Sequence, residues 1–266
     1  MERIVTSRTP RFVFFGAWIG LAFVALPLFG LLRKVAWSSL LTQLSDCPTR
    51  DALWLSVTTS VAATAIALVL GLPLAWILAR VEFRGRRLLR ALVMLPMVLP
   101  PVVGGVALLG AYGRSQGLLG SLLFDNFGLQ LTFSKLGVVV AETFVALPFL
   151  VMALEGGLRG IDPKFEESAA TMGAGDVARF FSVTLRLLRP SLFAGLAVAW
   201  ARALGEFGAT ITFAGNIQGR TQTAPLAVYL LLETDPQAAY ALSFLLLTIC
   251  VVVLVALRDK WIGNRA

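Results

Sequence analysis

The chain has 266 residues, of which 58% are hydrophobic and 14% charged, and its mean hydropathy is +0.82. In soluble globular domains charged residues make up roughly a quarter of the chain, so this composition excludes an ordinary soluble domain and indicates an integral membrane protein. The sequence contains no histidine, and its two cysteines, Cys47 and Cys250, lie in a loop and in an apolar run. Histidine-based metal sites and Ser-His-Asp catalysis are therefore excluded, and no disulfide is expected.

Apolar runs long enough to cross a bilayer recur along the whole sequence. A hydrocarbon core of roughly 30 Å requires about 20 residues of helix. The first run is too long for the hydrophobic part of a signal peptide, and no convincing cleavage site follows it, so we expect it to be retained. The sequence predicts a single transmembrane domain over residues 1–266, with an all-α integral membrane fold. Its six predicted spans are 12–32, 53–79, 91–112, 137–156, 191–213 and 239–257.

The positions of lysine and arginine predict how these spans are oriented. If the N-terminus lies inside, 16 of the 23 basic residues fall on the cytoplasmic side, 6 fall on the opposite side, and Arg202 lies within a span. Basic residues collect on cytoplasmic loops of membrane proteins. Both termini and the loop 157–190 are therefore expected in the cytoplasm. Topology accounts for the formal charge of +8, and no nucleic-acid partner is expected.

The third predicted span has prolines and glycines at its centre. These are Pro96, Pro100, Pro101, Gly104 and Gly105. Proline lacks a backbone N–H and kinks helices, and a membrane tolerates a broken helix only where protein or a water-filled cavity satisfies the freed groups. The span is expected either to line a pathway or to be a kinked packing helix, and the sequence leaves both open.

A short helix is predicted by the segment KFEESAATMG in the loop between the fourth and fifth spans. Asp162 can cap it, Pro163 suits its first position, and Glu166 and Glu167 lie near the positive end of the helix dipole. Gly173 can end the helix after roughly three turns.

Small side chains give this predicted helix a nearly flat surface, formed by Ser168, Ala169, Ala170 and Gly173. The backbone of another protein could approach such a surface closely, whereas the alternative is a solvated connector between two spans. A second helix is expected to start at Asp176 and to run to Pro190, which would open the fifth span.

Residues 167–189, ESAATMGAGDVARFFSVTLRLLR, resemble the E-A-A-x3-G-x9-I-x-L-P signature of permease subunits in bacterial ABC importers. Glu167, Ala169 and Gly173 match this signature, whereas Arg186 stands where proline is usual. The stretch ARALGEFGATITFAGNIQGRTQTAPLAVY is similar to the fifth-span region of molybdate permeases, and LPMVLPPVVGG and LGLPLAWILAR also fit that family.

The resemblance implies the fold of a type I ABC importer permease, in which the cytoplasmic loop forms a coupling helix that sits in a cleft of an ATP-hydrolysing subunit. Six residues would make this contact: Glu166, Glu167, Ser168, Ala169, Ala170 and Gly173. The chain has no G-x-x-x-x-G-K-[ST] phosphate loop, so it is not expected to be an enzyme or to bind a cofactor. ATP and Mg would be bound by the partner subunit.

The resemblance also implies an assembly in the bacterial cytoplasmic (inner) membrane. The implied assembly would contain two copies of this chain, two ATP-binding subunits and an external substrate-binding protein. It would transport molybdate, with tungstate as an open possibility. A sulfate or thiosulfate permease is the nearest alternative. An autonomous channel or an intramembrane enzyme is the alternative of a different class.

Three ionisable residues fall within predicted spans: Glu142, Arg202 and Glu206. An ionised side chain near the bilayer centre costs about 2.5–3.5 kcal/mol on insertion scales, so such residues usually face a cavity or a partner. Arg202 could attract an oxyanion on the translocation path, with the acidic residues limiting how tightly it is held. Alternatively, Arg202 pairs with Glu206 or Glu142 and fixes helix packing.

The stretch GNIQGRTQT after the fifth span contains three polar candidates, Asn216, Arg220 and Thr221. These residues could meet the binding protein or the incoming anion. The alternative is a polar turn whose glycines serve backbone geometry.

Overall fold

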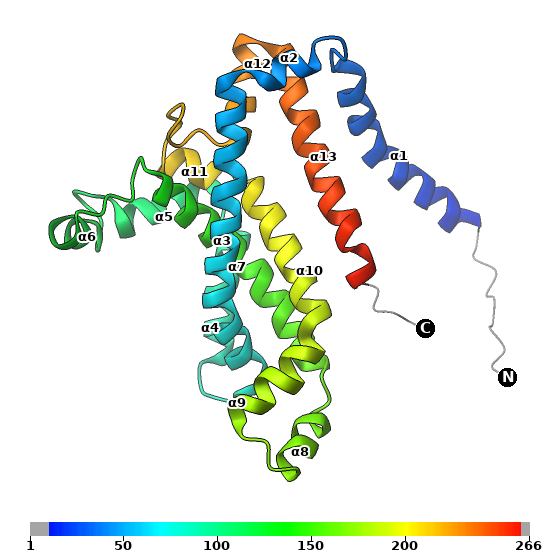
Figure 1. Ribbon diagram of the computed structural model, residues 1–266, viewed down its shortest axis with the longest axis vertical. Coiled ribbons are helices and arrows are strands. Elements are labelled where there is room, and N and C mark those ends of the chain that lie inside the picture. Colours follow the sequence, from blue (N-terminus) through cyan, green and yellow to red (C-terminus); the bar gives the residue numbers. More distant parts are fainter. Residues whose placement is uncertain (1–10, 262–266) are drawn as a thin grey trace.

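The computed structural model describes residues 11–261, which form α-helices, one π-helical turn and no strand. The all-α prediction is confirmed (Figure 1). The elements are α1 Arg11–Lys34, α2 Leu40–Ser45, α3 Cys47–Arg80, α4 Arg86–Val98, α5 Pro101–Tyr112, α6 Gly120–Phe127, α7 Lys135–Gly160, α8 Lys164–Thr171, α9 Asp176–Arg179, η1 Phe180–Thr184, α10 Leu185–Leu204, α11 Gly208–Phe213, α12 Ala224–Thr234 and α13 Pro236–Trp261.

Within the described residues, five helices are long and apolar enough to cross a membrane, and a bent pair raises the number of candidate spans to six. The five are α1, α3, α7, the continuous helix Asp176–Leu204 and α13, and the pair is α4 with α5. The number of spans agrees with the prediction. Arg3, Arg8 and Arg265, which contributed to the predicted orientation, lie outside the described residues.

The predicted span 91–112 is wrong as a continuous helix, because α4 and α5 meet at an angle of 117°. Leu99 and Pro100 have extended backbone conformations between the two helices. Pro100 and Pro101 follow one another and lack backbone N–H groups, and a proline disfavours the helical conformation of the residue before it. The pair of prolines therefore ends α4, and Pro101 starts α5 at the position that proline favours.

The predicted span 191–213 is also wrong at both ends. The helix passes through Pro190 without a boundary and ends at Leu204, and α11 begins after a three-residue break at Gly208. One proline removes only one backbone hydrogen bond, which transmembrane helices tolerate where neighbouring groups compensate. A π-helical turn, η1, precedes α10 and joins it to α9.

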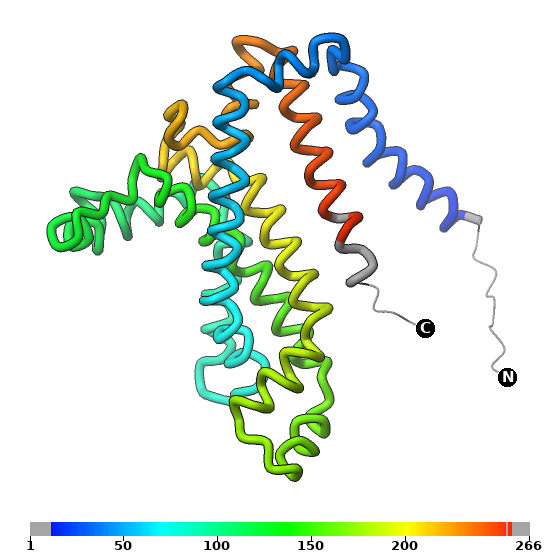
Figure 2. Tube along the Cα trace, in the orientation of Figure 1, coloured from blue at the N-terminus to red at the C-terminus, as the bar shows by residue number. Residues whose placement is uncertain are grey.

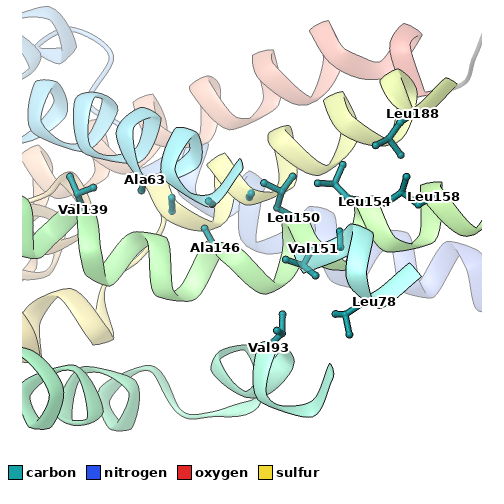
Figure 3. Packing of buried hydrophobic residues seen from close by; sticks show 14 of the residues in the cluster. Ala63, Leu78, Val93, Val139, Ala146, Leu150, Val151, Leu154, Leu158 and Leu188 are labelled. Carbon is teal, nitrogen blue, oxygen red and sulfur yellow. The ribbon is translucent and has the colours of Figure 1, made fainter. Parts of the chain in front are cut away.

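The core lies between α3, α7 and α10. α7 is its most enclosed member, because 61% of its apolar segment is buried, against 33% for α3 and 22% for the helix Asp176–Leu204. Leu150, Leu154 and Leu158 of α7 point into this core, together with Ala63 of α3 and Leu188 of α10 (Figure 3). Small residues on α3 and α10 let the helices approach α7 closely. The central helix thus joins the two ends of the molecule.

Two parts of the fold extend away from this core. The trace in Figure 2 shows α1 leaving the bundle on the side of α13, while α5 and α6 project on the opposite side. α8 and α9 lie together at one end of the bundle, here called the α8 end, and α2 and α12 lie at the other. The extended parts leave large apolar side chains exposed, including Phe23 on α1 and Val106 on α5.

Candidate coupling and translocation sites

The start of α8 has the predicted cap. The Asp162 carboxylate accepts a hydrogen bond from the Lys164 backbone N–H at 3.0 Å, and Pro163 has helical dihedral angles. Glu166 and Glu167 lie in the first turn, as predicted. Carboxylates there interact favourably with the positive end of the helix dipole.

α8 ends at Gly173, as predicted, but it has fewer turns than predicted. Gly173 has a φ of +86°, its N–H donates to Ala170 O at 2.9 Å, and the Ala174 N–H donates to Ala169 O at 3.0 Å. This is the Schellman arrangement, in which a left-handed residue that is usually glycine ends a helix. The helix has 8 residues, which is about two turns at 3.6 residues per turn. The predicted three turns included residues that belong to the caps.

Two of the six predicted docking residues face the protein's own chain. Glu166 accepts hydrogen bonds from Arg80 Nη2 at 3.2 Å and from Thr184 Oγ1 at 2.8 Å, and Ala169 is buried. In this structure Glu166 fastens α8 to the end of α3 and to η1. The prediction that Ala169 contributes to an open surface is therefore wrong, because that side of α8 packs inward.

The outward side of α8 is not flat, which corrects the predicted shape of the surface. Phe165 and Met172 are 56% and 84% exposed, and Ser168 lies between them on the same side. The spacing i, i+3, i+7 is that of one helical face, so the pattern could have been recognised in the sequence. Glu167 and Ala170 are also exposed.

A buried carboxylate at the α8 end was missed by sequence reasoning. Glu155 on α7 accepts hydrogen bonds from Arg90 on α4 at 2.6 and 3.1 Å and forms an ion pair with Arg159 at 2.6 Å. Arg159 lies four residues after Glu155, a spacing at which helical side chains meet. The contact with α4 has no sequence signal, because it depends on how two distant helices pack.

The charged residues predicted within spans are paired in two separate ways. Arg202 Nη2 lies 2.6 Å from Glu206 Oε2, whereas Glu142 Oε1 accepts a hydrogen bond from Thr59 Oγ1 at 2.9 Å. The alternative in which Arg202 pairs with Glu206 is confirmed. Glu206 and Glu142 are both buried, and Glu142 Oε2 has no hydrogen-bond partner among the described residues.

Glu206 has a second function in the break between α10 and α11. Its Oε1 accepts a hydrogen bond from the Ala209 N–H at 2.8 Å, so the side chain caps α11. The first N–H groups of a helix have no partner within the helix, and leaving them unsatisfied in a membrane is costly. Glu206 therefore satisfies both a backbone group and Arg202 where the span is interrupted.

The two interrupted spans contact each other, and we call this region the break junction, residues 99–101 and 205–208. A Cβ placed on Gly208 would lie 2.6 Å from Pro101 Cβ, and one on Gly105 would lie 2.6 Å from Thr212 Cβ. Only glycine permits such close approach of α5 to α11. Discontinuous membrane helices of transporters commonly surround the substrate path, so the junction is the structural candidate for that path.

The three candidate residues in the polar stretch after α11 differ in how far they are buried. Thr221 is fully buried and its Oγ1 accepts a hydrogen bond from the Ile217 N–H at 3.0 Å, so its assignment to an exposed contact is wrong. Its hydroxyl holds the turn instead. Asn216 is half-buried, and Arg220 is exposed.

The structure is that of a polytopic membrane protein with two interrupted spans and a capped helix at one end. The family model described as "Binding-protein-dependent transport system inner membrane component" matches residues 71–264. The chain belongs to this family, the permease subunits of ABC importers.

Three known proteins illustrate the relationship. The chain is 46% identical over 251 residues to the molybdenum transport system permease protein ModB of Mycobacterium bovis, covering 94% of each chain. It is 39% identical over 191 residues to the sulfate transport system permease protein CysT of Salmonella typhimurium, covering 71% of this chain and 68% of that protein. A bacterial alginate ABC transporter, in complex with alginate pentasaccharide-bound periplasmic protein, matches with a TM-score of 0.75 at 16% identity over 99% of both chains. The predicted fold class is confirmed.

Proposed function

We propose that this chain is the membrane subunit of an ATP-driven importer of molybdate, with tungstate as a second substrate. The observation that carries the proposal is the similarity to a molybdenum permease over 94% of the chain. The sulfate permease is less identical and matches a smaller share of the chain. Sulfate and thiosulfate remain the competing substrates, because sulfate shares the charge and tetrahedral shape of molybdate.

The proposed partner at α8 is a separate ATP-binding subunit, present in two copies, which holds ATP and Mg. Phe165 and Met172 are large apolar side chains on the exposed face of a short helix, where exposure to water is unfavourable unless a partner covers them. Glu167, Ser168 and Ala170 flank them and complete the proposed contact. Gly173 terminates the helix beneath this face.

A second copy of the chain is proposed to complete the pathway. The break junction belongs to the side of the molecule from which α5 and α6 project, and α5 exposes Val102 and Val106. Two copies facing each other across this region would enclose a path that one thin bundle leaves open. The membrane is proposed to be the bacterial inner membrane, with both termini and α8 in the cytoplasm, as the distribution of basic residues indicates.

The opposite end is proposed to receive an external substrate-binding protein. Arg220 is the exposed cation in the stretch after α11, and Asn216 precedes it by four residues in the same stretch. Within the membrane, Arg202 is partly exposed while Glu206 and Glu142 are buried. Arg202 is therefore the one of these three that a passing anion would contact, and Glu206 keeps its guanidinium in place.

Competition in reconstituted vesicles tests the proposal. The chain is purified with its ATP-binding subunit and binding protein, and uptake of labelled molybdate is measured with unlabelled tungstate or sulfate in excess. We expect ATP-dependent uptake that tungstate inhibits and sulfate does not. Equal inhibition by sulfate would make the chain a sulfate permease, and uptake without the ATP-binding subunit would make it a channel.

A further inference from the structure

The ion pairs of Glu155 form a connection between helices that the proposed function does not yet use. Glu155 is 4% exposed, and its Oε1 binds the guanidinium groups of both Arg90 on α4 and Arg159 on α7. We call these three residues the arginine clamp. Burying a carboxylate carries a large desolvation penalty, and apolar residues of similar size often stabilise a fold equally well. A buried ion pair is thus weak evidence of a purely stabilising function.

The clamp matters for α4 because apolar contacts hold this helix only weakly. Val93 is the only buried residue of α4. Leu89 and Met94 are partly buried against the same core, whereas Leu88, Leu92 and Leu95 are exposed. An apolar side chain contributes to helix packing only when neighbours cover it. Polar contacts are therefore a large part of what fixes α4 to α7.

A second polar contact fixes the start of α4 to the end of α3. Arg86 donates from Nε and Nη2 to Leu78 O at 2.9 and 2.6 Å. The last carbonyls of a helix lack partners within the helix, and basic side chains commonly satisfy them. Arg80, two residues after Leu78 on α3, forms an ion pair with Glu166 of α8. A continuous set of polar contacts thus runs from α8 through α3 to α4.

The other end of α4 leads into the break junction. α4 ends at Val98, and the 117° bend places α5 against α11. A rigid helix fixed at two points near its start transmits a displacement to its far end, whereas a loosely attached helix absorbs the displacement. Such coupling requires an element with two arrangements, and the extended residues Leu99 and Pro100, which separate α4 from α5, are where the inference places that change.

We propose that Arg90 and Glu155 are positioning residues that make α4 move with α3 and α7 as one body, so that a displacement of α8 reaches the α4–α5 break. The inference rests on the proposed docking of an ATP-binding subunit at α8. Arg90 and Glu155 would thus transmit a displacement between helices, although they touch neither the proposed nucleotide site nor the proposed anion path.

The test compares two distances in the complete complex in lipid nanodiscs, with Cys47 and Cys250 replaced by serine. Spin labels at Lys164→Cys in the two copies of the chain report on the separation of the α8 helices, and in a second sample labels at Val106→Cys in the two copies report on the separation of the α5 helices. ATP binding is expected to change both distances in the otherwise native chain. In Arg90→Gln the α8 distance should still change, while the change at α5 is lost.

Transport gives the matching functional readout. Molybdate taken up per ATP hydrolysed should fall about tenfold in Arg90→Gln, a typical size for coupling between sites, while ATP hydrolysis is retained. Arg90→Lys, which keeps the charge, should restore part of the loss. Arg90→Gln leaves Glu155 paired with Arg159, so no buried carboxylate is left alone.

Two matched variants separate the clamp from a general effect of losing charge. Arg87→Gln removes an exposed arginine of α4 that forms no ion pair within the described part of the chain. Arg159→Gln removes the clamp contact that stays within α7 and a hydrogen bond of 3.4 Å from Arg159 Nη2 to Leu78 O of α3, but it leaves the contact of Arg90 on α4 with Glu155 on α7. Both variants should keep the change of the α5 distance on ATP binding.

The outcomes distinguish the inference from the function on which it rests. If Arg90→Gln responds at α5 like the native chain, the transmission function is overturned and the docking of the partner is not affected. If Arg159→Gln abolishes the α5 response as fully as Arg90→Gln, the clamp is a stabilising cluster rather than a link between helices. If the α8 distance in the otherwise native chain does not change on ATP binding, the proposed docking is contradicted, and the inference that rests on it is contradicted as well.

Discussion

Charged residues at the α8 end and at the break junction are arranged in opposite ways. At the α8 end, partly exposed arginines bind two groups each: Arg80 binds Glu166 and Ile161 O, and Arg86 binds Leu78 O and Ala79 O. At the junction, the buried Glu206 lies between two helices, where it binds Arg202 of α10 and caps α11. Exposed ion pairs are worth little and exchange readily, whereas a buried carboxylate without its partners is costly. The first arrangement suits movement with a partner, and the second satisfies an interrupted span inside lipid.

The largest expected effect comes from removing the buried carboxylate at the junction. Glu206→Leu leaves Arg202 unpaired and the first turn of α11 uncapped, and breaking such a pair costs about 3–5 kcal/mol. Thermal unfolding in detergent should show a strongly destabilised protein. Glu206→Gln keeps an acceptor for the Ala209 N–H and should lose less thermal stability than Glu206→Leu. An equal loss of stability in both variants would show that the cap contributes nothing.

A smaller effect is expected from crowding the contact between α5 and α11. Gly105→Ala places a Cβ 2.6 Å from Thr212 Cβ, and overpacking of this kind costs about 1–3 kcal/mol. The midpoint of thermal unfolding should fall. Gly110→Ala, on the same helix with nothing within 4 Å of the new Cβ, is the matched control, and equal stability of both variants would show that the junction is loosely packed.

A comparable or smaller effect is expected at the second buried carboxylate. Thr59→Val removes the hydroxyl that donates to Glu142, and an unsatisfied buried acceptor costs about 1–3 kcal/mol. The change should lower the thermal midpoint in detergent. The double variant Thr59→Val with Glu142→Leu should recover stability, because both polar partners are then removed; further destabilisation by the second change would contradict this account.

The smallest effect on stability is expected at α8. Glu166→Gln weakens its contacts with Arg80 and Thr184, all at the partly exposed end of the bundle, and exposed ion pairs contribute about 0–1 kcal/mol. The thermal midpoint should hardly change, in contrast to Glu206→Leu. A loss as large as that of Glu206→Leu would remove the distinction between the two regions.

The local features could be predicted from the sequence, whereas the contacts between distant segments could not. Asp162 and Gly173 predicted the limits of α8 because capping depends on neighbouring residues, and the apolar runs predicted the number of spans. Arg202 and Glu206 were recognised as a possible pair because they are four residues apart. The contact of Arg90 with Glu155 and the inward side of Ala169 depend on tertiary packing, which no local pattern specifies.

The interruptions of two spans were only partly predictable, for a physical reason. The consecutive prolines Pro100 and Pro101 indicated that the helix could be kinked, but they did not indicate the 117° bend. The bend also depends on the close packing of α5 on α11. The break after Leu204 lies where Gly205 is followed by a capping carboxylate, Glu206. Glutamate is not among the usual capping residues, so its position within an apolar run concealed this function.

The most direct measurement of the central claim, that force from a partner enters at the exposed face of α8, is ATP-dependent molybdate uptake by Met172→Glu. A charge on this exposed apolar side chain should leave the fold intact, since surface changes usually alter stability by about 0.5 kcal/mol or less, but abolish binding of the ATP-binding subunit and uptake. Phe83→Glu, an exposed apolar side chain in the loop between α3 and α4, should retain both. Normal uptake by Met172→Glu, or equal loss in both variants, would contradict the account.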